Sequence, residues 1–270
     1  MERLQVLVAT MGQQDMSLVR KMNIRCSAVI ANQADREEIA IEGNVKMVTT
    51  ATRGVGLNRN IAILAADSEL VLFADDDVVY KDDMPEQVVK AFDENPQADV
   101  LIFGMDIVKD GKVREKRHLK SRRLRVWNSM RFGTYTIAAR RLSLVRHSIM
   151  FHRYFGGGCP FSSGEDSLLI KSCFDHRLKV YSHTYVLGTC CKDTSSWFRG
   201  YNEKYFYDKG VLMRCLFPRT PWIMALYFAI NFKRKTDLGV FQRIKWMHAG
   251  VLGGKRMITY QEHYEENHHR

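Results

Sequence analysis

The stretch that decides the fold is LVLFADDDVVY, which covers residues 70–80. Its apolar beginning is typical of a strand that is buried on both faces of a sheet. Asp75, Asp76 and Asp77 follow at once, and we expect them at the carboxyl end of the strand, where open α/β sheets bind ligands. Adjacent negative charges repel one another, and a hard cation such as Mg²⁺ or Mn²⁺ would offset that repulsion. A solvated acidic turn explains the run equally well, so the neighbouring motifs must distinguish the two.

The composition is that of a folded α/β protein. Hydrophobic residues make up 46% of the 270 positions, which suits one large domain, or one domain with an appendage. No apolar run reaches the roughly 20 residues of a membrane span. Residues 4–9, LQVLVA, are typical of a first strand and not of a signal peptide, so we expect a cytoplasmic protein. The six cysteines include no CxxC pair, which argues against a disulfide framework and a zinc site.

The formal net charge is +11, and the basic residues concentrate in residues 109–125 and 214–255. Such a balance implies an acidic partner, which could be a nucleic acid, nucleotide phosphates or an anionic membrane surface. Residues 109–125 are expected to form a solvated hairpin or a mobile loop. The apolar helix expected at 221–232, with the basic residues after it, would either lie at a membrane interface or pack on the domain.

Strand-like and helix-like stretches alternate over the first hundred residues. This alternation predicts a parallel, Rossmann-like sheet, with strands at 4–10, 26–31, 45–49, 69–74 and 100–103 and helices at 16–22, 61–66 and 85–92. Residues 53–60, RGVGLNRN, resemble a phosphate loop, although a plain glycine turn is the simpler interpretation. Arg53 and Arg59 flank this turn and could meet a diphosphate.

A second acidic motif lies about ninety residues after the first. The irregular, glycine-rich residues 154–161 precede Ser163-Gly164-Glu165-Asp166, and a helix is expected to follow. Ser163 could cap this helix with Asp166 at its third position, which would be a purely structural capping box. A carboxylate at a helix N-terminus beside a glycine loop is equally well placed to act as a general base.

Together, the order and spacing of these motifs resemble the family-2 inverting glycosyltransferases of the GT-A fold over about residues 4–210. The resemblance implies an α/β fold, namely a Rossmann-like mixed sheet flanked by helices, as in nucleotide-diphospho-sugar transferases. We therefore expect a GT-A domain at 1–210 and a C-terminal helical segment, able to associate with a membrane, at 211–270.

The resemblance also implies residue roles. Asp77 and Asp75 correspond to the DxD motif, which holds Mn²⁺ or Mg²⁺, and Asp166 corresponds to the catalytic base, with Glu165 beside it. The donor-binding positions implied are Thr10, Asn32, Gln33, Gly54, Arg59, Asn60, Asp75 and Asp76. The acceptor-side positions implied are Gly158, Trp197 and Arg199.

The chain departs from the family pattern at two places. Asn32 and Gln33 stand where the second strand usually ends in an acidic pair, so recognition of the nucleotide base would rely on amide groups. Thr189-Cys190-Cys191 stand where many members carry a histidine, and His183 comes earlier. The third metal ligand is therefore left open.

The function implied is a metal-dependent inverting hexosyltransferase. Its donor would be a nucleotide-diphosphate sugar, with a UDP-sugar expected first. Its acceptor would be a hydroxyl of a lipid-linked glycan in capsule, O-antigen or exopolysaccharide synthesis. Such a protein would be cytoplasmic, or peripheral on the inner face of the cell membrane. The alternative is a non-catalytic α/β protein that binds nucleic acid through its basic surface, with residues 122–127 as the best segment. Carboxylates at both Asp77 and Asp166 favour the enzyme, and no nucleic-acid partner is then expected.

Overall fold

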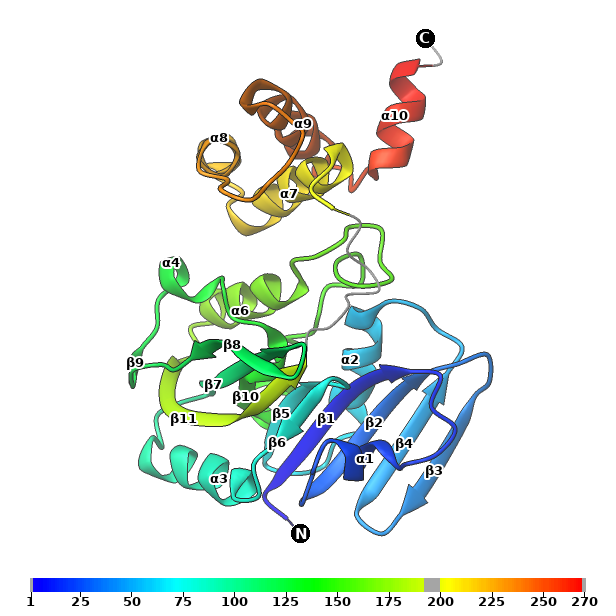
Figure 1. Cartoon of the computed structure of the whole chain (residues 1–270), viewed down its shortest axis with the longest axis vertical. Helices are drawn as coiled ribbons and strands as arrows, with labels where there is room; N and C mark the ends of the chain where they lie inside the picture. Colours follow the sequence, from blue (N-terminus) through cyan, green and yellow to red (C-terminus); the bar gives the residue numbers. More distant parts are fainter. Residues whose placement is uncertain (1, 192–199, 269–270) are drawn as a thin grey trace.

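The computed structural model describes residues 2–191 and 200–268. In this part of the chain a mixed sheet with helices against both faces forms the body, and further helices extend beyond one end (Figure 1). The strands are β1 (Leu4–Met11), β2 (Ser27–Gln33), β3 (Glu38–Glu42), β4 (Val45–Thr50), β5 (Leu70–Asp75), β6 (Val78–Tyr80), β7 (Val100–Lys109), β8 (Lys112–Arg117), β9 (Arg122–Arg123), β10 (Ile137–Arg140) and β11 (Val180–Cys191). The helices are α1 (Leu18–Lys21), α2 (Val55–Ala65), α3 (Met84–Glu94), α4 (Val126–Ser129), the 3-10 helix η1 (Thr134–Thr136), α5 (Arg141–Arg146), α6 (Glu165–Asp175), α7 (Glu203–Leu216), α8 (Pro221–Ile230), α9 (Val240–Gly253) and α10 (Tyr260–His268).

The strands run in the order β3-β4-β2-β1-β5-β10-β7-β11-β6. Strands β4, β2, β1 and β5 are parallel, and β10 lies antiparallel between β5 and β7. The register pairs Thr10 with Asn32 and Asn32 with Thr49, while Ala9 pairs with Asp75. The carboxyl ends of these strands therefore meet at one edge of the sheet, which is the arrangement that open α/β folds use for ligands.

Strand β5 is buried on both faces, as its apolar sequence predicts. Leu70, Leu72 and Ala74 belong to the core under α1 and α3, whereas Val71 and Phe73 belong to the core under α2, α5 and α6. This split follows from the two-residue period of a strand. Asp75, Asp76 and Asp77 lie where β5 ends, so their predicted position at the carboxyl end of the strand is confirmed.

Three details of the expected element pattern need correction or addition. The helix expected at 61–66 begins six residues earlier, at Val55. Gly54 is its N-cap residue and takes a positive φ of 103°, a conformation that glycine adopts readily. The short strands β3 and β6 were not predicted. Residues 109–125 form the antiparallel β7–β8 hairpin followed by β9, so of the two expectations the hairpin is right.

The C-terminal helices have a core of their own. Their buried side chains pack with Phe155 and Phe161 from the loop before α6. Helices α7 and α9 cross at Gly210 and Gly250, where a Cβ on Gly250 would lie 2.0 Å from the carbonyl oxygen of Tyr207. The expected domain boundary after residue 210 falls inside α7, and the division of the chain there remains a prediction. None of the helices in the described part of the chain is long and apolar enough to cross a membrane.

Candidate active site

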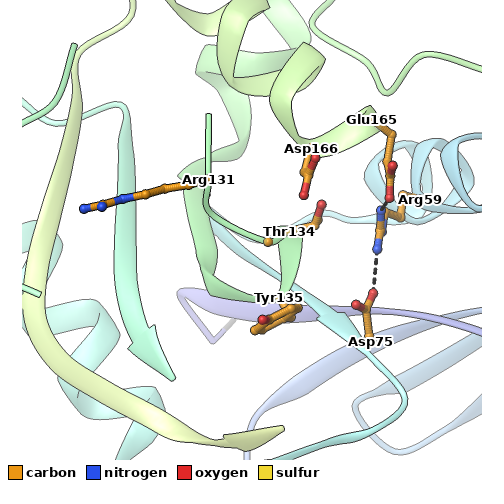
Figure 2. Close-up of a pocket in the computed structure, with 8 residues that line it drawn as sticks. Arg59, Asp75, Arg131, Thr134, Tyr135, Glu165 and Asp166 are labelled. Atoms are coloured by element: carbon orange, nitrogen blue, oxygen red, sulfur yellow. Dashed lines mark hydrogen bonds and ion pairs between the residues drawn. The ribbon is translucent and has the colours of Figure 1, made fainter. Parts of the chain in front are cut away.

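Arg59 of α2 lies at the edge of the sheet where the carboxyl ends of the parallel strands meet. Its guanidinium donates to Asp75 Oδ1 at 2.6 Å and to Glu165 Oε1 at 3.0 Å, and only 5% of the side chain is exposed (Figure 2). Burial works to lower the pKa of Arg59, but the charges of Asp75 and Glu165 outweigh it, so the net shift is upward. A single buried cation thus joins the strand-end acids to the start of α6, although the two segments are ninety residues apart.

Glu165 and Asp166 have different environments, because adjacent residues on a helix point about 100° apart. Glu165 is turned toward Arg59, and its Oε2 also accepts from the Gly164 N–H at 3.0 Å. Asp166 Oδ1 accepts from the Ser167 N–H at 2.7 Å. Burial, and then the charge of Glu165, raise the pKa of Asp166 to about 6. Asp166 therefore has the basicity that a general base needs near neutral pH.

Asp166 and Asp75 line the same pocket, which has a volume of about 220 Å³. In Figure 2 the side chains of Glu165 and Asp166 descend from the start of α6 toward the end of β5. The full lining is Arg59, Asp75, Arg131, Gly133, Thr134, Tyr135, Glu165 and Asp166. The tertiary structure thus brings the two acidic motifs together around one small, polar space.

The predicted cap of α6 is wrong. Gly164, not Ser163, is the N-cap residue, and no side chain caps the helix. Gly164 takes a φ of 124°, and a Cβ there would lie 2.5 Å from Leu212 on α7, so both the backbone and the packing require glycine. Ser163 Oγ instead accepts from Lys209 Nζ at 3.0 Å.

Lys209 reaches the site from α7, and no sequence motif marks it. Burial lowers the pKa of Lys209, while the charges of Asp166, Glu165 and Asp208 oppose that shift. Lys209 in turn works to lower the pKa of Asp166. The helix that follows the site thus contributes a cation to the environment of the candidate base.

The three strand-end acids make separate contacts. Asp75 binds Arg59, Asp76 Oδ2 accepts from Thr10 Oγ1 at 2.6 Å, and Asp77 Oδ1 lies 3.5 Å from Cys190 Sγ. In the described residues no cluster of three or more histidine, cysteine or acidic side chains has the arrangement of a metal site. Two carboxylates still fit Mg²⁺ or Mn²⁺, because such ions are commonly held by one or two carboxylates together with substrate phosphates. The resemblance assigns such an ion to Asp77 and Asp75.

The position of the family histidine is filled by β11. The Cys191 N–H donates to the backbone oxygen of Asp77 at 2.9 Å, and Cys190 is buried beside the same residue. His183 lies elsewhere, with its ring 5.4 Å from the ring of Phe103. Strand β11 therefore contacts Asp77 through Cys190 and Cys191, and its histidine, His183, lies away from the acids.

A second pocket, of about 430 Å³, lies beyond the ends of β1 and β2. Its lining includes Gln33, Arg36 and Arg53, with Arg53 paired to Asp35. Asn32 is fully buried and binds both backbone groups of Gln13 at 2.9 Å. Of the two amides predicted to meet the nucleotide base, only Gln33 faces this pocket.

Two asparagines of α2 hold neighbouring backbone. Asn60, predicted to bind the donor, exchanges hydrogen bonds with both backbone groups of Phe151, at 2.7 and 2.9 Å. Asn58, which was not predicted as a site residue, donates to the carbonyls of Thr10 and Ala31. Both side chains are buried and bind backbone groups, so they hold together the segments around the site.

The acceptor side is described only in part. Gly158 is exposed in the loop that leads to α6, while Trp197 and Arg199 lie outside the described residues. The pocket of about 220 Å³ is also lined by Arg131, Thr134 and Tyr135, which were not predicted as site residues. Thr134 is 3% exposed, and its Oγ1 has no hydrogen-bond partner within the described part of the chain.

Comparison with known proteins identifies the domain. Residues 27–152, which include β2, α2, the strand-end acids and β10, match the family described as Glycosyl transferase family 2. The chain carries a glycosyltransferase family 2 domain. Its enzyme class is glycosyltransferase, and its fold is GT-A, as the resemblance implied.

Solved structures agree with this glycosyltransferase fold. TarS 1–349 from S. aureus in complex with UDP-GlcNAc has a TM-score of 0.60 and 17% identity, covering 98% of this chain and 75% of that one. The complex of TarS 1–349 with UDP has a TM-score of 0.56 and 16% identity, covering 96% of this chain and 76% of that one. At these identities the likeness establishes the fold alone. No curated protein sequence matches the chain.

Proposed function

We propose that this glycosyltransferase moves a sugar from a nucleotide-diphosphate sugar to an acceptor hydroxyl with inversion at the anomeric carbon. The observation that carries the proposal is that Asp166 and Asp75 line one pocket of about 220 Å³. Asp75 is the first of the three strand-end acids, beside which a diphosphate leaving group would lie.

Asp166 is the proposed base. It takes the proton of the acceptor hydroxyl while that oxygen attacks the anomeric carbon, and the bond between this carbon and the diphosphate oxygen breaks. One displacement inverts the centre and releases the nucleoside diphosphate. The raised pKa of Asp166, about 6, leaves the carboxylate ionised at neutral pH but more basic than an ordinary aspartate.

Asp77 and Asp75 are proposed to hold Mn²⁺ or Mg²⁺ with the donor. The ion would supply positive charge against the diphosphate as negative charge develops there. Arg59 keeps Asp75 in place from the protein side, so this carboxylate is oriented before donor or metal arrives.

A UDP-sugar is the proposed donor, with the base in the pocket that Gln33 lines. TarS, whose fold this chain shares, has been crystallised with UDP-GlcNAc and with UDP. The proposed acceptor is a lipid-linked glycan of capsule, O-antigen or exopolysaccharide synthesis, used at the inner face of the membrane.

The proposal is tested in two steps. A panel of UDP- and GDP-sugars is screened by thermal shift with and without Mn²⁺, because a bound donor stabilises the folded state by mass action. The donor that gives the largest shift is then used with candidate acceptors, and NMR of the product assigns the anomeric configuration. Retention of configuration, or no shift with any sugar nucleotide, would contradict the proposed function.

A further inference from the structure

Helix α8 presents an apolar face to solvent. Its ten residues are all apolar, and Pro221, Ala225 and Ala229 on one side are buried against the neighbouring helices. A helix that covers a core normally carries polar residues on its other side. The other side of α8, which we call the α8 outer face, carries residues that are 38–65% exposed, namely Trp222, Ile223, Leu226, Tyr227 and Ile230.

The apolar surface continues onto α9, which packs beside α8 at the end of the molecule remote from the sheet (Figure 1). The Trp222 ring lies 4.4 Å from the ring of His248. His248 shares one stripe of α9 with Phe241 and Leu252, because these residues are spaced seven and four apart. Phe241 is 89% exposed and Leu252 50%. A contiguous surface of this kind marks an interaction site, whereas single exposed apolar residues do not.

Positive charge surrounds the α8 outer face. Residues 209–259 contain ten lysines and arginines but one acidic residue, Asp237. Lys233, Arg234 and Lys235 begin three residues after the last residue of α8, and all three are exposed. Lys245 lies on the same α9 stripe as Phe241 and is also exposed.

We propose that the α8 outer face and the adjoining α9 stripe dock on an anionic lipid bilayer. At 1.5 Å per residue α8 is about 15 Å long, too short to span a hydrocarbon core of about 30 Å, so it would lie in the plane of the interface. Trp222 and Tyr227 have the amphipathic rings that are enriched at headgroup level. The lysines and arginines around the face would meet the anionic headgroups.

Charge complementarity favours a bilayer over a second copy of the chain. Two copies joined through their α8 outer faces would bring both sets of basic residues together. In residues 209–259 each copy has one acidic residue, Asp237, to pair with the basic residues of the other copy. Like charges opposed across an interface disfavour association. An anionic bilayer supplies both an apolar layer and the opposite charge.

This inference rests on the proposed function only in that a lipid-linked acceptor would be met at a membrane. The binding assay contains no sugar nucleotide, so its failure and the failure of glycosyl transfer are distinguishable. A chain that binds a sugar nucleotide but no vesicles would contradict the docking alone.

The experiment is co-sedimentation of the full chain with vesicles of phosphatidylcholine alone, or with about one third phosphatidylglycerol. We expect binding to the anionic vesicles that weakens as salt is raised, because salt screens the surface charges. The double variant Lys233→Gln/Lys235→Gln should lower the partition coefficient about fivefold for each lysine removed. Arg234 is left in place because it contacts Tyr201. The triple variant Ile223→Gln/Tyr227→Gln/Ile230→Gln should abolish binding.

The control residues come from the edge strand β3, which lies far from α8 (Figure 1). Ile39 and Ile41 on β3 are 69% and 65% exposed, so Ile39→Gln/Ile41→Gln removes comparably exposed apolar side chains elsewhere and should leave binding unchanged. Brominated lipid should quench tryptophan fluorescence in the wild type and less in Trp222→Phe. Equal binding to neutral and anionic vesicles, or a triple variant that binds like the β3 control, would overturn the proposal. A dimer seen by light scattering that the triple variant dissociates would assign the face to a second copy instead.

Discussion

Arg59 on α2 lies 2.6 Å from Asp75 at the end of β5, with 5% of the arginine side chain and 34% of the aspartate side chain exposed. The same guanidinium holds Glu165. The cation therefore orients carboxylates from both acidic motifs before any ligand is present.

Arg59→Met should be strongly destabilising. Removing one partner of a buried ion pair leaves uncompensated charge and costs about 3–5 kcal/mol. Urea unfolding would measure the loss. Arg25→Met, which breaks an exposed pair with Asp82, is the control and should cost under about 1 kcal/mol. Equal losses for the two variants would contradict a central role for Arg59.

Asp166→Asn should lower turnover by about 10²–10⁴-fold, the contribution of a general base, while donor affinity stays near the wild-type value. Glu165→Gln should cost less, because Glu165 contacts Arg59 and the backbone. Asp175→Asn, at the exposed end of α6, is the matched control. Turnover of Asp166→Asn within a fewfold of wild type would place the base elsewhere, with Glu165 as the next candidate.

The same variant should not lower the melting temperature at neutral pH. The pKa of Asp166 is raised to about 6 in the folded protein from an ordinary 3.8, so the ionised carboxylate opposes folding above pH 6. Asparagine removes that charge and keeps an oxygen for the Ser167 N–H. Any gain in melting temperature should vanish as the pH falls from about 6 to 3.8, because the wild-type carboxyl is then protonated in the folded state.

The rate should rise with pH through about 6 and then level off, because the candidate base works only when ionised. Lys209→Met should move this rise to higher pH, since the positive charge of Lys209 works to lower the pKa of Asp166. Lys171→Met on the far part of α6 should leave the profile unchanged. A Lys209→Met profile that coincides with wild type would leave Lys209 a packing role only.

Asp77→Ala should remove the Mn²⁺ dependence of donor binding and abolish transfer, with the melting temperature of the unliganded chain little changed. Thermal shift with the best sugar nucleotide, with and without Mn²⁺, measures the first effect. Asp82→Ala, just beyond β6, serves as the control. Full turnover by Asp77→Ala would contradict the metal assignment.

Gly250→Ala should destabilise the C-terminal helices. The new methyl group would lie 2.0 Å from the carbonyl oxygen of Tyr207, and overpacking of this kind costs about 1–3 kcal/mol. Gly239→Ala, where a Cβ meets nothing closer than 3.8 Å, should be tolerated. Thermal melts of both variants measure the difference, and equal melting temperatures would contradict a tight α7–α9 crossing.

The sequence by itself determined the strand that ends in Asp75-Asp76-Asp77 and the family of the domain. A strand buried on both faces is encoded by a continuous apolar run, and in β5 three carboxylates mark where that run stops. The start of α2 was missed because glycine and asparagine are poor local helix formers. Here packing overrides propensity. A Cβ at position 56 would lie 2.6 Å from the carbonyl oxygen of His152, so glycine is needed there. The side chains of Asn58 and Asn60 form hydrogen bonds with backbone groups far away in the chain.

Only the tertiary structure decided which polar residues face the site. Asn32 and Gln33 are adjacent in the chain and both are buried, yet Asn32 binds the backbone of Gln13 while Gln33 lines a pocket, because successive residues of a strand point to opposite sides. Lys209 and Thr134 carry no motif at all, and they reach the candidate site through the packing of α7 on α6 and the position of η1 against β5. Local patterns fix where a chain turns and which faces are apolar. Contacts between residues forty or more positions apart depend on how those faces pack, and that information is absent from any single stretch.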